Sequence, residues 1–118
     1  MIPKSKPYKT KRQLRKANYR KNRQPTREKA FELDGGRCVW PTCRRWIGNL
    51  SYAHIHEVKW RSRGGDPTDI EITVTMCGIC HMAIHPQIGG IKKKMEGSRS
   101  EGFRYYERQP DDTWLEVT

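Results

Sequence analysis

The sequence has no long apolar run and few of the residues that build a large core. Hydrophobic residues make up 34% of the 118 residues, only two are phenylalanine, and the mean hydropathy is −0.98. No stretch approaches the roughly 18 apolar residues of a membrane-spanning helix, and the charged start does not resemble a signal peptide. We therefore expect one small domain in the cytoplasm, without membrane contact, that needs a metal or disulfides for stability.

Cysteine is also scarce, and its spacing is informative. Four residues separate Cys38 from Cys43, and two separate Cys77 from Cys80. Both gaps are typical of thiolate pairs that close around zinc, and a structural zinc takes four protein ligands. A reducing compartment favours a metal over disulfides. We predict one structural zinc site that uses all four cysteines.

Two histidines follow these cysteines in a short helix predicted over residues 78–85, before Pro86. His81 and His85 are four residues apart and so share one helix face, where both can point at one ion. The segment CGICH also matches a haem-attachment pattern, but that interpretation leaves two cysteines unexplained. A disulfide oxidoreductase is disfavoured because no parallel-sheet pattern surrounds the segment. The histidine pair is therefore available for a second metal ion.

Acidic residues are nearly absent from the start of the chain. Residues 1–29 hold twelve Lys or Arg and one acid, whereas the remainder holds twelve of each kind. We predict a basic flexible arm over residues 1–25, then a helix with Thr26 as its N-cap that ends at Gly35 and Gly36. The arm is either a solvated tail or a segment that binds nucleic-acid phosphates. The candidate DNA-binding residues in it are Lys11, Arg12, Arg15, Lys16, Arg20 and Lys21.

The middle and end of the chain show strand patterns. Residues 50–60 alternate with Tyr52, His54 and His56 on one face, and residues 70–76 alternate again after a glycine-containing loop. Beyond the helix, residues 92–94 form a basic triplet, and the pattern of residues 103–107 and 113–117 predicts a hairpin.

This order of strand, glycine-rich loop, strand and helix resembles the HNH endonucleases, particularly small phage and bacterial members that contain zinc. The resemblance covers about residues 27–87 and rests on CVWPTC, RSRGG and the ending MC-x2-CH-x3-H. It implies an α+β fold: a zinc-stapled ββα-metal (His-Me finger) domain over residues 26–90. The basic arm precedes this domain, and a basic loop with a C-terminal β-hairpin follows it over residues 91–118.

The resemblance also implies a site. His56 matches the family's first metal ligand, His81 its closing histidine, and His85 an additional helix ligand, so these three would hold a catalytic ion. Glu57 stands where the family has its general-base histidine, and Ile72 lies near the position of its asparagine. The base would then be Glu57 or, displaced by two residues on the same strand face, His54.

The implied function is metal-dependent DNA cleavage by phosphodiester hydrolysis, with Mg²⁺, Mn²⁺, Ni²⁺ or Zn²⁺ as the catalytic cation. Arg61 and Arg63 would hold flanking phosphates or else belong to a solvated loop. The alternative is a catalytically impaired, zinc-stabilised module that binds DNA or protein, because Glu57 and Ile72 are changes that such a descendant would show. By resemblance, phage packaging proteins are further candidate partners, and a phage-encoded protein would work in the infected host cell.

Overall fold

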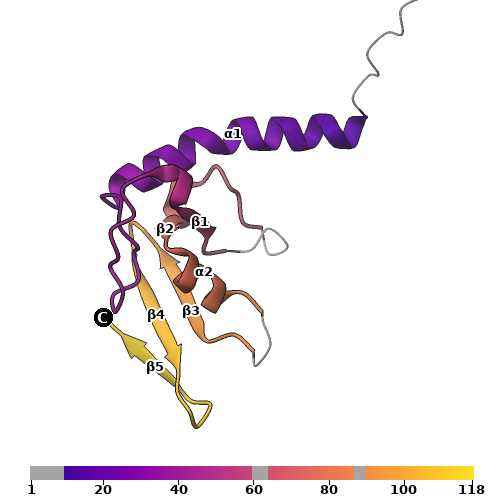
Figure 1. The fold of residues 1–118 in the computed structure, drawn as a ribbon. Coiled ribbons are helices and arrows are strands. Elements are labelled where there is room, and N and C mark those ends of the chain that lie inside the picture. The colour runs from indigo at the N-terminus through magenta and orange to yellow at the C-terminus, as the bar shows by residue number, and fades with distance from the viewer. Residues whose placement is uncertain (1–9, 60–63, 87–89) are drawn as a thin grey trace, which may run out of the picture.

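The computed structural model describes residues 10–59, 64–86 and 90–118, and the side chains of residues 17–20 also lie outside the description. Within these residues the chain forms a small α+β structure with two α-helices and two antiparallel sheets (Figure 1). Helix α1 (Lys11–Leu33) lies across one side, and its first half reaches away from the rest of the molecule. The described residues include no helix that is long and apolar enough to cross a membrane.

Helix α1 begins earlier than predicted. Thr10 and Gln13 form a capping box, in which Thr10 Oγ1 accepts from the Gln13 amide at 3.2 Å and Gln13 Oε1 accepts from the Thr10 amide at 2.8 Å. The helix continues through Pro25, so the prediction of a helix that starts with Thr26 as its N-cap was wrong. Thr26 instead donates its hydroxyl to the Thr68 carbonyl at 3.2 Å. The capping box and the Lys, Arg and Gln residues favour the helix on the N-terminal side of Pro25, although a proline in a helix interior costs about 3 kcal/mol.

The end of α1 follows the prediction. Asp34 is the C-cap, and Gly35 and Gly36 then adopt φ values of +64° and +68°. Residues with a Cβ rarely take this left-handed conformation, so the glycine pair turns the chain away from the helix axis. The turn brings the segment between the bridged residues Arg37 and Trp46 beneath α1 (Figure 1). This segment, which holds Cys38 and Cys43, is the cysteine loop.

The first sheet is a two-stranded antiparallel hairpin. Strand β1 (His54–Glu57) pairs with β2 (Thr73–Met76), with His56 opposite Val74. Both strands begin later than predicted because a 3₁₀ turn precedes each one, at Leu50–Tyr52 and Ile70–Ile72. Asn49 and Asp69 cap these turns by accepting amide hydrogens from residues two positions further on, and such local bonds compete with strand pairing.

Strand β2 is the centre of the fold. The alternating pattern predicted one buried face, but all four of its residues are buried. On the edge away from β1, the Val39 amide donates to the Thr75 carbonyl at 3.0 Å, and the Thr75 amide donates to Asp34 Oδ2 at 2.8 Å. The cysteine loop and the end of α1 therefore cover what would otherwise be an open strand edge.

The second sheet contains one strand more than predicted. Strands β3 (Lys93–Ser98), β4 (Gly102–Arg108) and β5 (Trp114–Val117) are antiparallel in that order. The hairpin of β4 and β5 was predicted, whereas the β3 segment was predicted only to be a basic loop. Gly97 makes the β3–β4 turn possible, because its φ is +102° and a Cβ there would collide with the Gly102 carbonyl oxygen.

Trp40 joins the two sheets. Its side chain is fully buried, its Nε1 donates to Glu107 Oε2 at 2.6 Å, and its ring meets Tyr105 edge-on at 5.1 Å between centroids. Glu107 and Tyr105 both belong to β4. The cysteine loop is thus attached to the C-terminal sheet by one residue that supplies both apolar area and a hydrogen bond.

A buried ion pair provides a second link between the sheets. Arg99, in the β3–β4 turn, donates Nη1 to Asp34 Oδ1 at 2.8 Å and Nη2 to Asp34 Oδ2 at 3.0 Å. Arg99 also donates to the carbonyls of Ile70 and Thr73, at 3.0 and 2.7 Å. The pair therefore connects the end of α1, the start of β2 and the C-terminal sheet.

Candidate metal centres

The four cysteines form one cluster, as their spacing predicts. Their Sγ atoms all lie within 4.8 Å of one another, and no disulfide joins them. The Sγ atoms of Cys43 and Cys77 are 3.7 Å apart. Tetrahedral zinc with bonds of about 2.3 Å would separate its sulfur ligands by about 3.8 Å. The cluster is therefore compatible with a structural zinc site.

Two local structures place these thiols. In the cysteine loop, the amides of Cys43 and Arg44 both donate to the Trp40 carbonyl at 3.0 Å, and Arg44 takes a φ of +54° to turn the chain back. On the other side, Cys77 is the N-cap of α2 (Gly78–Ile84). Its Sγ accepts from the Cys80 amide at 3.5 Å, and such N–H groups favour the thiolate form that a metal requires.

The thiols form hydrogen bonds with one another and with a lysine, and these contacts change their pKa values. A hydrogen bond from Cys80 is the largest of the effects that lower the pKa of Cys38, to about 5, and they outweigh the opposing effect of burial. The same hydrogen bond raises the pKa of Cys80, so it favours the thiolate form of Cys38 over that of Cys80. Lys93 Nζ lies 3.3 Å from Cys80 Sγ and 4.8 Å from the centre of the Trp40 ring. No sequence pattern indicated this lysine, which offsets the negative charge of four thiolates.

Three histidines form a second cluster, beside α2. His56 from β1, His81 from α2 and His85, the C-cap residue of α2, each bring a ring nitrogen within 4.8 Å of the others. The Nε2 atoms of His81 and His85 are 2.9 Å apart, and the His56 ring lies 5.3 Å and 6.0 Å from theirs, measured between centroids. Metal–nitrogen bonds of 2.0–2.1 Å at right angles give nitrogen separations of about 3 Å. The donor set therefore fits a divalent cation.

The three histidines of this cluster differ in their exposure to solvent. His56 is buried, His81 is half-buried and His85 is exposed, so the site opens to solvent on the His85 side. Burial, followed by the charge of the neighbouring imidazoles, lowers the pKa values of His56 and His81 to about 4. Both rings are consequently neutral at neutral pH, which is the form that binds metals.

The remaining candidate residues lie in several parts of the structure. His54 lies beside the cluster, with its Nδ1 3.1 Å from His81 Nδ1. Glu57 follows His56 on β1 and points to the opposite face of the strand. Ile72 is half-buried in the turn before β2. Arg61 and Arg63 lie outside the described residues, and of the candidates on α1 the side chain of Arg20 does too, whereas the others are exposed: Lys11, Arg12, Arg15, Lys16 and Lys21.

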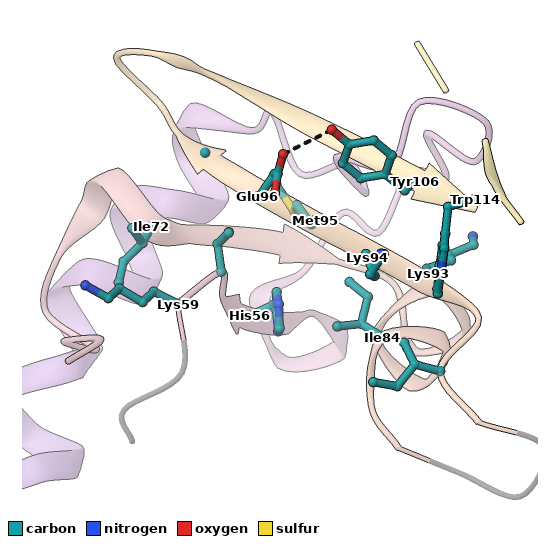
Figure 2. A pocket seen from close by; sticks show the side chains of 13 residues that line it. His56, Lys59, Ile72, Ile84, Lys93, Lys94, Met95, Glu96, Tyr106 and Trp114 are labelled. Atoms are coloured by element: carbon teal, nitrogen blue, oxygen red, sulfur yellow. Dashed lines mark hydrogen bonds between the residues drawn. The ribbon is translucent and has the colours of Figure 1, made fainter. Parts of the chain in front are cut away.

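A cavity of about 810 Å³ lies next to the histidine cluster (Figure 2). It runs between the first sheet and β3, with Lys59 and Ile72 at one end and Lys94 and Trp114 at the other. His56 is in its wall, but His81 and His85 are not. The cavity therefore meets the three-histidine cluster only through the His56 ring.

Comparison with protein-family models, curated proteins and solved structures gave no match.

Proposed function

We propose that the protein is a metal-dependent DNA endonuclease of the HNH type, built on a ββα-metal finger. The observation that carries this proposal is that three imidazoles, from β1, from α2 and from the C-cap of α2, bring ring nitrogens within 4.8 Å of one another. The chain order of β1, β2 and α2, with the hairpin directly before the helix, is the order that the resemblance implies. A separate four-cysteine cluster leaves the histidines free for catalysis.

In this proposal His56, His81 and His85 would hold the catalytic cation. When bound, such a cation polarises the scissile phosphate and stabilises negative charge on the leaving oxygen. The exposed side of His85 gives the substrate access. Glu57, which stands at the position of the family's base, is the preferred general base although it points to the opposite strand face from His56, because the Nδ1 of the competing candidate His54 is already in contact with His81.

The test is plasmid cleavage by zinc-loaded protein with added Mg²⁺, Mn²⁺, Ni²⁺ or Zn²⁺. His81→Ala is expected to abolish cleavage, because it removes a central ligand. Glu57→Gln is expected to slow cleavage about 10²- to 10⁴-fold, the usual contribution of a general base, while metal and DNA affinities stay unchanged. Glu116→Gln, which removes an exposed carboxylate on β5, is the matched control and should cut like wild type.

A second function is favoured by the presence of Glu57 and Ile72 at the positions noted above. These replacements suit a module that binds DNA or protein without cutting it. Wild-type protein that binds DNA and a second ion, yet cleaves with none of the four metals, would establish this function and contradict the first.

The basic half of α1 is proposed to bind DNA backbone phosphates. Deleting residues 1–24 leaves Pro25 in the first turn of the shortened helix, where proline is tolerated. The body of the protein, residues 25–118, should therefore stay folded with its zinc. We expect weaker DNA binding at every sequence, because the deleted cations no longer displace counterions from the DNA. The slope of log K against log salt should flatten by roughly 0.9 for each phosphate that the shortened protein no longer neutralises.

A variant that keeps the helix but removes four of its charges tests whether the charge of this segment is what binds DNA. Replacing Lys11, Arg12, Arg15 and Lys16 by glutamine removes four exposed charges but retains good helix formers. Fluorescence anisotropy over a salt series should then show a reduced slope. An unchanged slope in both variants would mean that the arm is a solvated tail.

A further inference from the structure

His54 contacts the three-histidine cluster without belonging to it. Its Nδ1 lies 3.1 Å from His81 Nδ1, and the two ring centroids are 5.1 Å apart with their planes inclined at 59°. The other nitrogen of His81, Nε2, faces His85 Nε2 at 2.9 Å. His81 therefore turns Nε2 toward the cluster and Nδ1 toward His54.

This arrangement determines where the proton of His81 must lie. A neutral imidazole has one N–H and one lone pair. If the Nε2 lone pair of His81 is to face a cation, its hydrogen is on Nδ1 and points at His54 Nδ1. His54 then accepts with Nδ1 and carries its own hydrogen on Nε2. Histidines that bind metals commonly donate their second N–H to such a partner, which orients the ring.

Gly78 makes room for the His54 ring. His54 is the first residue of β1, and Gly78 is the first residue of α2. A Cβ added at Gly78 would lie 3.2 Å from His54 Nε2 and 3.7 Å from two of its ring carbons, which is a tight contact. The absence of a side chain at this position allows the ring to rest against the first turn of α2, below His81.

We propose that His54 is a positioning residue: it accepts the Nδ1 hydrogen of His81 and so fixes the tautomer and orientation of His81 toward a divalent cation. The inference rests on the metal site of the proposed function and assigns a role to a histidine outside the three ligands. It also replaces the general-base role that the sequence leaves open for His54.

The test measures affinity for the second metal and does not require cleavage. Protein whose cysteine site is filled with zinc is titrated with Ni²⁺ by calorimetry, as wild type and as His54→Ala and His54→Asn. Asparagine places its Oδ1 near the position of histidine Nδ1, so it keeps an acceptor but can serve neither as a base nor as a good Ni²⁺ ligand. Tyr52→Ala, a neighbouring exposed aromatic residue, is the matched control.

We expect His54→Ala to weaken Ni²⁺ binding about 10- to 100-fold, the usual effect of removing the partner of a metal ligand. His54→Asn and Tyr52→Ala should bind like wild type. Gly78→Ala should weaken binding less than His54→Ala does, because the added methyl group requires the exposed His54 ring to shift by only a small amount; the φ of Gly78 is not positive, so the backbone tolerates alanine.

Three outcomes would overturn the inference. Equal affinity in wild type and His54→Ala would show that the contact has no positioning effect. Equal loss in His54→Asn and His54→Ala would show that His54 is itself a ligand. Wild type that takes up no Ni²⁺ beyond its zinc would remove the site and the inference together. Wild type that binds Ni²⁺ in the expected pattern but never cuts DNA would contradict only the nuclease function.

Discussion

Cys38→Ser is expected to unfold the body of the protein rather than merely alter its site. Cys38 is fully buried and belongs to the core cluster together with Trp40, Met76 and Cys80. Structural zinc sites supply on the order of 10 kcal/mol or more of folding free energy, and a fold this small has little other apolar burial to replace it. Circular dichroism and metal analysis of the purified variant should show that both the secondary structure and the zinc are absent.

The control for this experiment is Arg45→Gln, at an exposed position in the same loop. It should keep its zinc and its circular dichroism spectrum, because the Arg45 carbonyl, which accepts from the Cys38 amide, is unchanged by the substitution. A chelator that removes zinc from wild type should reproduce the unfolding of Cys38→Ser. A folded, zinc-free Cys38→Ser protein would show that the thiol cluster is not what holds the core together.

Arg99→Met is expected to lower the free energy of unfolding by about 3–5 kcal/mol, the usual effect of removing one partner of a buried ion pair. The side chains of Arg99 and Asp34 are only 18% and 6% exposed. Without the guanidinium, the Asp34 carboxylate stays buried, and the carbonyls of Ile70 and Thr73 lack their hydrogen bonds to Arg99. The penalty therefore comes from uncompensated polar groups more than from the missing attraction.

Urea unfolding of zinc-saturated protein measures this effect. Asp112→Asn is the control, because the Asp112 side chain is 87% exposed and its ion pair with Arg108 Nε is long, at 3.9 Å. Asparagine also tolerates the φ of +66° at this position. Its unfolding midpoint should hardly move, as is usual for surface pairs. If Arg99→Met unfolded at the wild-type urea concentration, the paired groups would have to be accessible to water.

The parts of the structure that the sequence predicted correctly depend on short-range geometry. The two Cys pairs lie close in sequence, so local turns can bring each pair together. His85, the C-cap residue of α2, follows His81 by about one helical turn, so their rings meet although the helix ends at Ile84. Gly35 and Gly36 end α1 because of their own backbone conformations. The helix over residues 78–84 was predicted to within one residue of its end because Pro86 cannot continue a helix.

The parts that were missed depend on contacts between distant segments. Nothing near Asp34 in the sequence indicates Arg99, and nothing near Trp40 indicates Glu107. Strand β3 escaped detection because its Lys, Glu and Gly residues have low strand propensity, and it is held by pairing with β4. The start of α1 was misplaced because proline is typical of the first turn of a helix, whereas this helix begins at Lys11 after a capping box at Thr10 and contains Pro25 in its interior.

Helix α1 contains two segments that should differ in hydrogen exchange. After Pro25 the helix packs on the body, and Ala30 is fully buried, whereas the side chains of residues 11–16 are all exposed. Pro25 has no amide hydrogen, so the helical ladder is already interrupted between the two segments. An isolated helix as short as residues 11–24 is marginal in water, because few bonds compensate its nucleation. Amides before Pro25 should therefore exchange through frequent local opening, while those near Ala30 exchange only when the folded body opens.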